Sequence, residues 1–295
     1  MAYNIFAASS IVVFIALGSL LQMQFGRTGI VNFGIVGFVG IGMYGFGILT
    51  TRYDLSVPVA LVVTTLITTA VAAVLGWLIL DLDGEAILVA TLAFASIVYY
   101  LTVTQKELTG GVTGLGGIPY PIDAGLDSAL VLLVILTVLA VVFLAYAYRL
   151  GRVPYGRLLA SIKDNEQLAR SLGKSTFREK LVFFALTSGL MGLVGALYAS
   201  ANQFLVPRML DAGLTFTVWI ALTLGGRAKI LGPVIGVLVS VALFDLLVEP
   251  YLPVPRALAP LMPDLQLMLY GLILVAVILF RPLGLLGGRH EGGRS

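Results

Sequence analysis

Residues 149–180, RLGRVPYGRLLASIKDNEQLARSLGKSTFREK, form the one long polar interruption in a chain that is otherwise a series of apolar runs. The stretch holds eight of the eighteen Lys and Arg residues of the chain but only three acidic residues. A membrane-protein loop this basic is retained on the cytoplasmic side. The basic residues are Arg149, Arg152, Arg157, Lys163, Arg170, Lys174, Arg178 and Lys180.

The pattern inside this loop predicts two short amphipathic helices. Between residues 156 and 163, Leu158, Leu159 and Ile162 fall on one helical face, opposite small and polar residues. Helices of this kind need an apolar surface to lie on. The pattern leaves three surfaces open: the membrane, the spans of the chain itself, and a soluble partner.

Capping signals predict where the second helix begins and ends. Asp164 can cap its start, with Gln167 three positions on as the capping-box partner. Glu166 and Arg170 are spaced to form an ion pair along the helix. Gly173 supplies a left-handed stop.

The rest of the loop leads directly into the next span. Leu168 and Leu172 lie four positions apart on the second helix. Thr176 and Glu179 then form a second capping box, which we expect to open the following apolar helix. The loop is therefore expected to be folded rather than an irregular linker.

The composition predicts a membrane protein. Of 295 residues, 59% are hydrophobic and 11% are charged, and the mean hydropathy is +1.03, whereas soluble domains have roughly 25% charged residues. Apolar runs recur from end to end, so we expect an all-α, polytopic transmembrane bundle forming a single domain over residues 1–295. The net charge of +3 reflects basic cytoplasmic loops and does not indicate nucleic-acid binding. The chain has no cysteine, which excludes disulfides and thiolate metal sites.

The apolar runs predict about eight or nine membrane spans, the first of them a retained span and not a cleaved signal peptide. With residues 149–180 on the cytoplasmic side, alternation places fourteen of the eighteen basic residues in cytoplasmic loops and four outside. This bias predicts an external N-terminus and a cytoplasmic C-terminus. The expected spans lie at about 5–25, 30–50, 57–80, 86–104, 128–148, 181–202, 211–225, 230–248 and 265–281.

The expected span at 211–225 is short. Asp211 can cap a helix there, and Gly225 and Gly226 can end it. About fifteen residues at 1.5 Å each reach only some 22 Å, against a hydrocarbon core of ~30 Å. We expect either a half-helix or a strongly buried span.

Three polar residues are expected near a substrate pathway. Asp245 is the one clearly ionisable residue inside the apolar spans, which makes it a functional candidate, although its place near a span end fits a solvated position equally well. Asn32 borders the glycine-dense second span and Thr91 lies in the fourth. Polar side chains among close-packed glycines suit a water-accessible seam. Ordinary hydrogen bonding between helices is the alternative.

Several motifs resemble one known family. The segments GRLLASIKDNEQLARSLGKS and KLVFFALTSGLMGLVGALYA are similar to the cytoplasmic coupling loop and following helix of branched-chain amino acid type ABC transporter permeases, the LivH/LivM-like family, closer to LivM. Residues 109–119 fit the family pattern TGGxxGLxGIP, and 91–94 fit TLAF. Residues 224–233 fit its LGG…GP segment, and 270–285 fit its C-terminal element. The resemblance covers nearly the whole chain.

The resemblance implies a permease subunit of an ATP-driven importer in the inner (plasma) membrane, which is not itself an enzyme. The implied partners are a second homologous permease, two cytoplasmic ATPase subunits and an extracytoplasmic substrate-binding protein. ATP and Mg²⁺ would bind to the ATPases, and no cofactor or metal to this chain. Family members carry branched-chain amino acids, other amino acids, urea or short amides, so the substrate stays open.

In these importers the coupling loop docks on the ATPase and switches the pathway between outward and inward access. The family pattern Glu-Ala-Ala-x-x-x-Gly is kept loosely here as Glu166, Ala169 and Gly173, with the Glu one position early. The residues expected at this contact are Arg157, Leu158, Ile162, Asp164, Glu166, Leu168, Ala169, Leu172 and Gly173.

Two other classes of protein fit less well. A secondary transporter or channel acting alone usually needs charged relays inside its bundle, and this chain offers only Asp245. A membrane scaffold without transport leaves the glycine-rich spans unexplained. Residues 173–175 end like a phosphate-binding loop, but Leu168 occupies the place of its first glycine and no strand precedes it, so we expect no ATP binding by this chain.

The orientation can be tested by labelling single cysteines in the cysteine-free chain. We predict that cysteine at Asp123 or Asp264 reacts with a membrane-impermeant reagent from outside, whereas cysteine at Lys174 or Arg289 reacts only after permeabilisation. The reason is the placement of basic loops in the cytoplasm. Labelling of the cysteine at position 174 in intact cells would show that the chain has the opposite orientation in the membrane.

Overall fold

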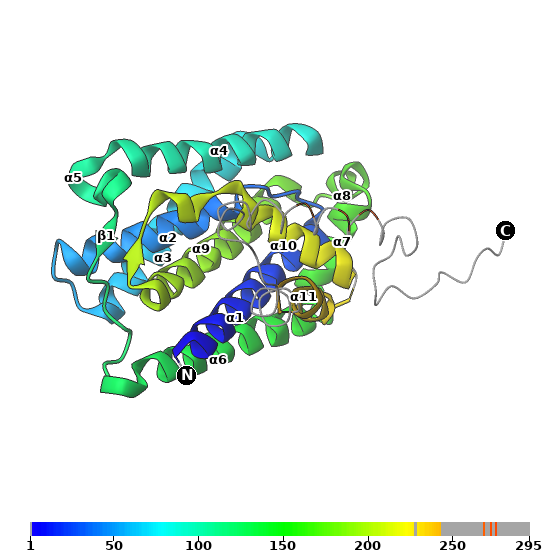
Figure 1. Ribbon diagram of the computed structural model, residues 1–295. Coiled ribbons are helices and arrows are strands. Elements are labelled where there is room, and N and C mark those ends of the chain that lie inside the picture. Colours follow the sequence, from blue (N-terminus) through cyan, green and yellow to red (C-terminus); the bar gives the residue numbers. More distant parts are fainter. Residues whose placement is uncertain (1, 227–228, 243–267, 269–271, 273–274, 276–295) are drawn as a thin grey trace.

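The structure, a computed structural model, describes residues 2–226 and 229–242, with residues 268, 272 and 275. Helices make up nearly all of its regular structure, as the sequence predicts (Figure 1). The principal helices are α1 (Ala2–Met23), the π-helical turn η1 (Gln24–Thr28), α2 (Ile35–Thr51), α3 (Val57–Ile79), α4 (Gly84–Thr104), α6 (Ser128–Leu150), α9 (Thr176–Asn202), α10 (Ala212–Gly225), α11 (Gly232–Val237) and the π-helical turn η5 (Leu238–Ala242).

Five helices in the described part are long and apolar enough to cross a membrane: α1 with η1, α3, α4, α6 and α9. The expected spans at 57–80, 86–104 and 128–148 coincide with α3, α4 and α6 to within two residues. Helix α2 is apolar but shorter, with 17 residues. The expected span at 265–281 and the end of the one at 230–248, with Asp245, lie outside the described residues apart from the three isolated positions.

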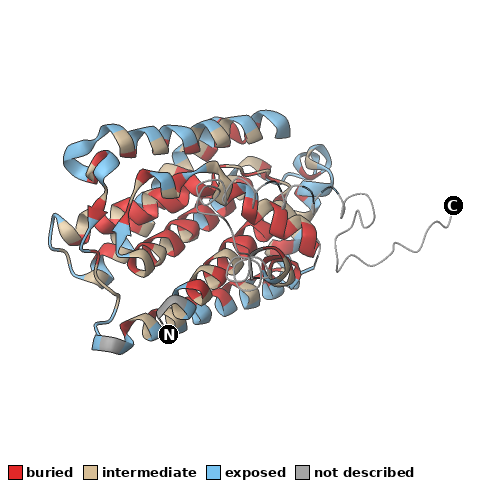
Figure 2. Ribbon diagram, in the orientation of Figure 1, coloured by how far each residue is buried: buried red, intermediate tan, exposed pale blue. Residues whose placement is uncertain are grey.

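Burial divides the helices into a central group and an outer group. Helices α1, α2 and α9 are largely buried, whereas α3, α4 and α6 show broad exposed faces (Figure 2). On α6 the exposed face is apolar and includes Val134, Val138 and Val141. An extended apolar surface of this kind marks contact with lipid or another protein, which agrees with a bundle embedded in a membrane.

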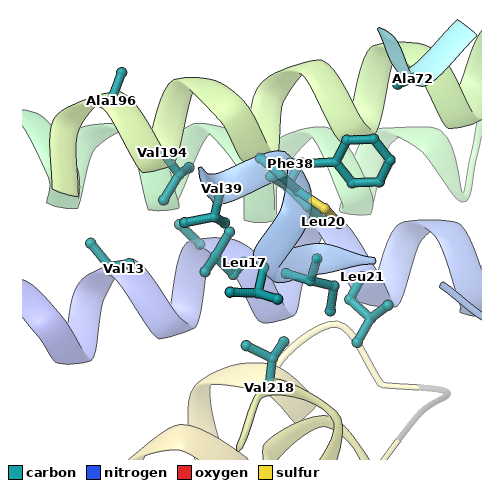
Figure 3. Packing of buried hydrophobic residues seen from close by; sticks show 14 of the residues in the cluster. Val13, Leu17, Leu20, Leu21, Phe38, Val39, Ala72, Val194, Ala196 and Val218 are labelled. Carbon is teal, nitrogen blue, oxygen red and sulfur yellow. The ribbon is translucent and has the colours of Figure 1, made fainter. Parts of the chain in front are cut away.

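Glycines bring α2 and α9 into backbone contact. A Cβ added to Gly42 would overlap the carbonyl oxygen of Gly192, and one added to Gly195 would overlap that of Val39. Glycine at this density lets helices approach backbone to backbone, and α2 and α9 do so here. Around this contact, apolar side chains of α1, α2, α9 and α10 form one cluster, with Leu17 and Val218 among its members (Figure 3).

The two long polar loops lie at opposite ends of the bundle (Figure 1). Loop 105–127 contains α5 (Lys106–Thr109), short 3₁₀ turns (Gly111–Thr113 and Gly125–Asp127) and the strand β1 (Leu115–Gly116). Strand β1 pairs antiparallel with β2 (Phe204–Leu205), so the loop is joined to the segment after α9. Loop 149–180 lies at the other end and contains α7 (Pro154–Asp164) and α8 (Glu166–Ser171).

A first non-helical segment, 29–34, lies between η1 and α2. The span expected at 30–50 therefore starts at Ile35, because Gly29 takes a left-handed φ of +74° that ends the preceding helix. The segment is nevertheless inside the bundle, since Ile30 and Asn32 are both buried.

A second non-helical segment, 203–211, runs from β2 through the 3₁₀ turn η4 (Pro207–Leu210) to α10. Leu210 packs against Gly40 on α2, and Ala212 shares a cavity with Val36 at the start of α2. Helix α10 thus begins partway along the bundle and has 14 residues, about 21 Å in length. Helix α10 is short for a span and eight of its residues are buried, so it agrees with both expectations for 211–225.

Candidate functional site

The basic loop 149–180 is folded as two short helices, as predicted, but the cap of the second helix lies one residue later than expected. Asn165 has extended backbone angles, and its Oδ1 accepts a hydrogen bond of 2.9 Å from the N–H of Leu168. Asp164, the predicted cap, is instead the last residue of α7. Asp and Asn cap equally well, so composition alone could not choose between neighbouring positions.

Helix α7 turns its apolar face toward its own chain. Leu159 and Ile162 are buried, and Gly156 lies against the carbonyl of Leu150 where no side chain would fit. Ile162 was expected to face an ATPase, but packing within the chain covers it. Leu158 is half-buried and Arg157 is exposed.

Helix α8 presents the opposite arrangement. Ala169 is buried against the rest of the chain, whereas Leu168 and Leu172 are 56% and 71% exposed. Gly173 has φ +78°, which confirms the left-handed stop. Of the apolar residues expected at a partner surface, Leu168 and Leu172 are the two that are free to take part.

Glu166 attaches α8 to the bundle through hydrogen bonds and an ion pair. Its carboxylate accepts hydrogen bonds from Arg170 Nη2 at 3.0 Å, as predicted, and from Lys180 Nζ at 2.8 Å. Lys180 is buried and also donates to the carbonyl of Leu80. Partial burial raises the pKa of Glu166, but hydrogen bonds from Lys180, Thr176 and Arg170 and the charge of Lys180 outweigh it, so the pKa lies below its ordinary value.

The second predicted capping box is not formed. Thr176 is the first residue of α9 rather than its cap, and the N–H of Glu179 bonds the carbonyl of Ser175. The hydroxyl of Thr176 instead accepts a hydrogen bond from Arg170 Nε at 2.8 Å. This side chain therefore joins α8 to α9, which is a tertiary contact that local spacing does not indicate.

Helix α7 also contacts the π-helical turn η1 at the end of α1. Lys163 Nζ donates to the carbonyl of Gly26 at 3.1 Å and lies 5.7 Å from the ring centre of Phe25. The same ring packs edge-on against Trp219 of α10. Single π-helical turns inside α-helices are frequent at functional sites.

A buried polar cluster starts at this turn. Gln24 Nε2 donates to the hydroxyls of Thr187 and Ser188 on α9, at 2.7 and 3.0 Å. Gln24 Oε1 accepts from Asn32 Nδ2 at 2.9 Å. Asn32 in turn accepts at Oδ1 from the N–H of Gly34. The side chains of η1 and segment 29–34 therefore connect α1 to α9 through hydrogen bonds.

The structure brings Asn32 and Thr91 together. Thr91 Oγ1 accepts from the N–H of Phe33 at 3.0 Å, and the carbonyl of Asn32 accepts from Trp219 Nε1 at 2.9 Å. Both residues thus hold segment 29–34 in place, as the interhelical alternative proposed. Gln24 and Trp219 complete this cluster.

A cavity of about 170 Å³ lies beside this cluster, at the start of α10. Its lining combines the first residues of α2 and α10 with polar side chains of α4. Asp211 lies in the lining and caps α10 as predicted, since its Oδ1 accepts from the N–H of Gly213 at 2.7 Å. The other lining residues are Val36, Leu92, Ala95, Ser96, Tyr99, Tyr100, Leu210 and Ala212.

Comparison with known proteins identifies relatives of the chain. The family described as "Branched-chain amino acid transport system / permease component" matches residues 1–278. The high-affinity branched-chain amino acid transport system permease protein LivM of Salmonella typhimurium is 28% identical over 95% of this chain and 69% of its own length. LivM of Escherichia coli has the same identity and coverage.

Another relative, matched over a shorter stretch, belongs to a different import system. The autoinducer 2 import system permease protein LsrC of Photorhabdus laumondii is 32% identical over 35% of this chain and 31% of its own length. No solved structure is significantly similar to the chain.

We predict that Glu166→Gln loosens α8 from the bundle by about 1–2 kcal/mol, because buried Lys180 loses its counter-charge. The measurement is the labelling rate of a single cysteine placed at buried Ala169, which should rise about tenfold. Asp164→Asn, at an exposed position in the same loop, is the control.

The same ion pair predicts a pH dependence. The folded pKa of Glu166 lies below its ordinary value of 4.5, so the stabilisation is full above pH 4.5 and is lost as the pH falls through the folded pKa. Labelling with a reagent active in acid should therefore accelerate below pH 4.5 in the parent protein. It should not do so in Glu166→Gln, and equal acceleration in both would show that another group controls the loop.

Proposed function

The chain belongs to the family of branched-chain amino acid transport system permease components, and from that premise we propose that it is the membrane-spanning permease of an ATP-driven ABC importer for branched-chain or related amino acids. It acts beside a second homologous permease, two cytoplasmic ATPases and an extracytoplasmic binding protein. ATP and Mg²⁺ bind to the ATPases. The chain lies in the inner membrane with about eight or nine spans and a cytoplasmic C-terminus.

One observation carries this proposal: α8 is held firmly to the bundle while its two leucines stay exposed. Leu168 and Leu172 are more than half exposed at the end of the bundle where the basic loop lies. Exposed leucines next to a folded, charged anchor are suited to a partner that buries them. The resemblance to permeases of ABC importers supports the ATPase as that partner.

Two connections carry movement of the loop into the bundle. Helix α8 is linked by Glu166 to Lys180, on the second turn of α9. Helix α7 is linked by Lys163 to the turn η1, which leads to Gln24 and the buried polar cluster. A force on the loop therefore reaches both α9 and the break between α1 and α2.

The substrate pathway, in this proposal, passes the cavity beside Asn32 and Thr91. Non-helical backbone at membrane depth is tolerated where it is buried in protein or lines a water-filled cavity, and transporters place substrates at broken helices. Segment 203–211 ends at this cavity, which Leu210 and Asp211 line together with Val36 at the start of α2. Asn32 and Thr91 hold its shape rather than line it.

For coupling, we predict that Leu168→Asp abolishes transport-coupled ATP hydrolysis or releases the ATPase. A buried leucine contributes roughly 1.5–3 kcal/mol to docking, and a carboxylate in its place adds a desolvation cost. The measurements are ATPase activity, uptake by liposomes containing the whole complex, and retention of the ATPase in a pull-down.

Two controls distinguish coupling from folding. Lys174→Ala, at an exposed position of the same loop, should leave all three measurements unchanged, since exposed charges contribute about 0–1 kcal/mol. The Leu168→Asp permease pair should still assemble in the membrane. Normal coupled uptake with full ATPase retention in Leu168→Asp would show that α8 is not the docking surface.

For the pathway, we predict that Ser96→Trp, which fills the cavity at the start of α10, strongly lowers uptake while the complex still assembles. Thr137→Trp on the exposed face of α6 is the matched control and should have little effect. Uptake rate and apparent affinity for leucine, isoleucine and valine are the measurements. If Ser96→Trp takes up substrate at the wild-type rate, the substrate does not pass through this cavity.

A further inference from the structure

A second cavity, of about 490 Å³, lies at the end of the bundle that carries α7. It opens between the ends of α1 and α6, next to the turn η1. Its main lining residues are Gln22, Phe25, Arg27, Ala147, Lys163 and Ile230. This second cavity has no role in the transport pathway proposed above.

The charge in this cavity is positive, and no ion pair within the described part of the chain neutralises it. Arg27 and Lys163 line it, and its lining includes no acidic residue. Within the described part of the chain Arg27 forms no ion pair, and its guanidinium lies close to Gly151. Lys163 donates one N–H to the carbonyl of Gly26 and has two more available. These groups suit an anion, above all a phosphate.

Gln22 adds a second requirement. Its side chain is 7% exposed, and its Nε2 donates to the carbonyl of Lys229 at 2.8 Å. Its Oε1 has no hydrogen-bond partner among the residues that the structure describes. A buried acceptor without a donor is costly, and a bare anion would not supply one. The ligand that satisfies the cavity therefore carries a hydrogen-bond donor close to its anionic group.

The surroundings place the cavity at the membrane–water boundary. Tyr146 and Tyr148, on either side of the lining residue Ala147, are nearly half exposed at the end of α6. The guanidinium of Arg152 lies 4.1 Å from the ring centre of Tyr148. Tyrosine and basic residues gather at this boundary, and α6 carries an exposed apolar face on its remaining length.

We propose that this cavity binds the headgroup of a phospholipid whose phosphate is next to a hydroxyl or ammonium donor, as in phosphatidylglycerol or phosphatidylethanolamine. Arg27 and Lys163 hold the phosphate, and the donor pairs with Gln22 Oε1. The acyl chains lie along the apolar surface of α6. Basic pockets between membrane helices are known to select lipid headgroups, and this binding is independent of the transported substrate.

The test is native mass spectrometry of the full complex in micelles with added phosphatidylglycerol, phosphatidylethanolamine or phosphatidylcholine, which lacks a donor. The first two should bind more tightly than the third. Arg27→Gln should weaken binding of phosphatidylglycerol roughly 10- to 100-fold. Gln22→Met should reduce the preference for donor-bearing lipids over phosphatidylcholine. The control is Arg178→Gln, which removes an exposed charge in loop 149–180. It should change neither the affinity for phosphatidylglycerol nor the preference among the three lipids.

Three results would overturn the proposal. Equal binding of the three lipids would exclude selection through Gln22. Binding of inorganic phosphate that depends on Arg27, with lipid binding unchanged in Arg27→Gln, would make the cavity a site for a soluble anion. If Arg27→Gln releases the ATPase and leaves lipid binding unchanged, the cavity instead binds an acidic side chain of the ATPase.

Discussion

The backbone of segment 29–34 must satisfy its hydrogen bonds inside an apolar bundle, and much of the polar architecture follows from this constraint. Water is not available there to replace a lost helical bond. Asn32, Thr91 and Trp219 supply side-chain partners, and Gln24 holds Asn32 in position. These side chains come from the segment itself, η1, α4 and α10, and Gln24 also donates to two hydroxyls of α9. The break therefore also fixes how α1, α4, α9 and α10 sit around it.

A different constraint, helix length, explains how the loop 149–180 is built. Its two helices are too short to be stable alone, so each is attached to the bundle by a different device. Helix α7 uses buried apolar residues, among them Leu159, and α8 uses the ion pair of Glu166 with Lys180. The result is a loop that is anchored on its inner face and exposes apolar side chains, chiefly Leu168 and Leu172, on its outer face.

The sequence predicted the local elements of the fold well and its long-range contacts poorly. Hydrophobic runs and turn residues located α3, α4 and α6, and Gly173 and Asp211 act as predicted, because these signals depend on neighbouring residues. Amphipathic spacing predicted that Ile162 packs against an apolar surface, but it could not tell whether that surface belongs to this chain, to a partner or to the membrane. The bond from Trp219 to Asn32 joins positions 187 residues apart, for which one sequence has no periodic signal.

Helix α9 has 27 residues and is therefore a rod about 40 Å long. Its glycines lock it against α2, so the two helices behave as one stiff beam rather than two that slide. The anchor of α8 is near one end of this beam, and β2 follows its other end. A tilt of about 5° at the anchored end would displace the far end by roughly 3–4 Å, so a small movement on one side of the membrane has a mechanical counterpart on the other.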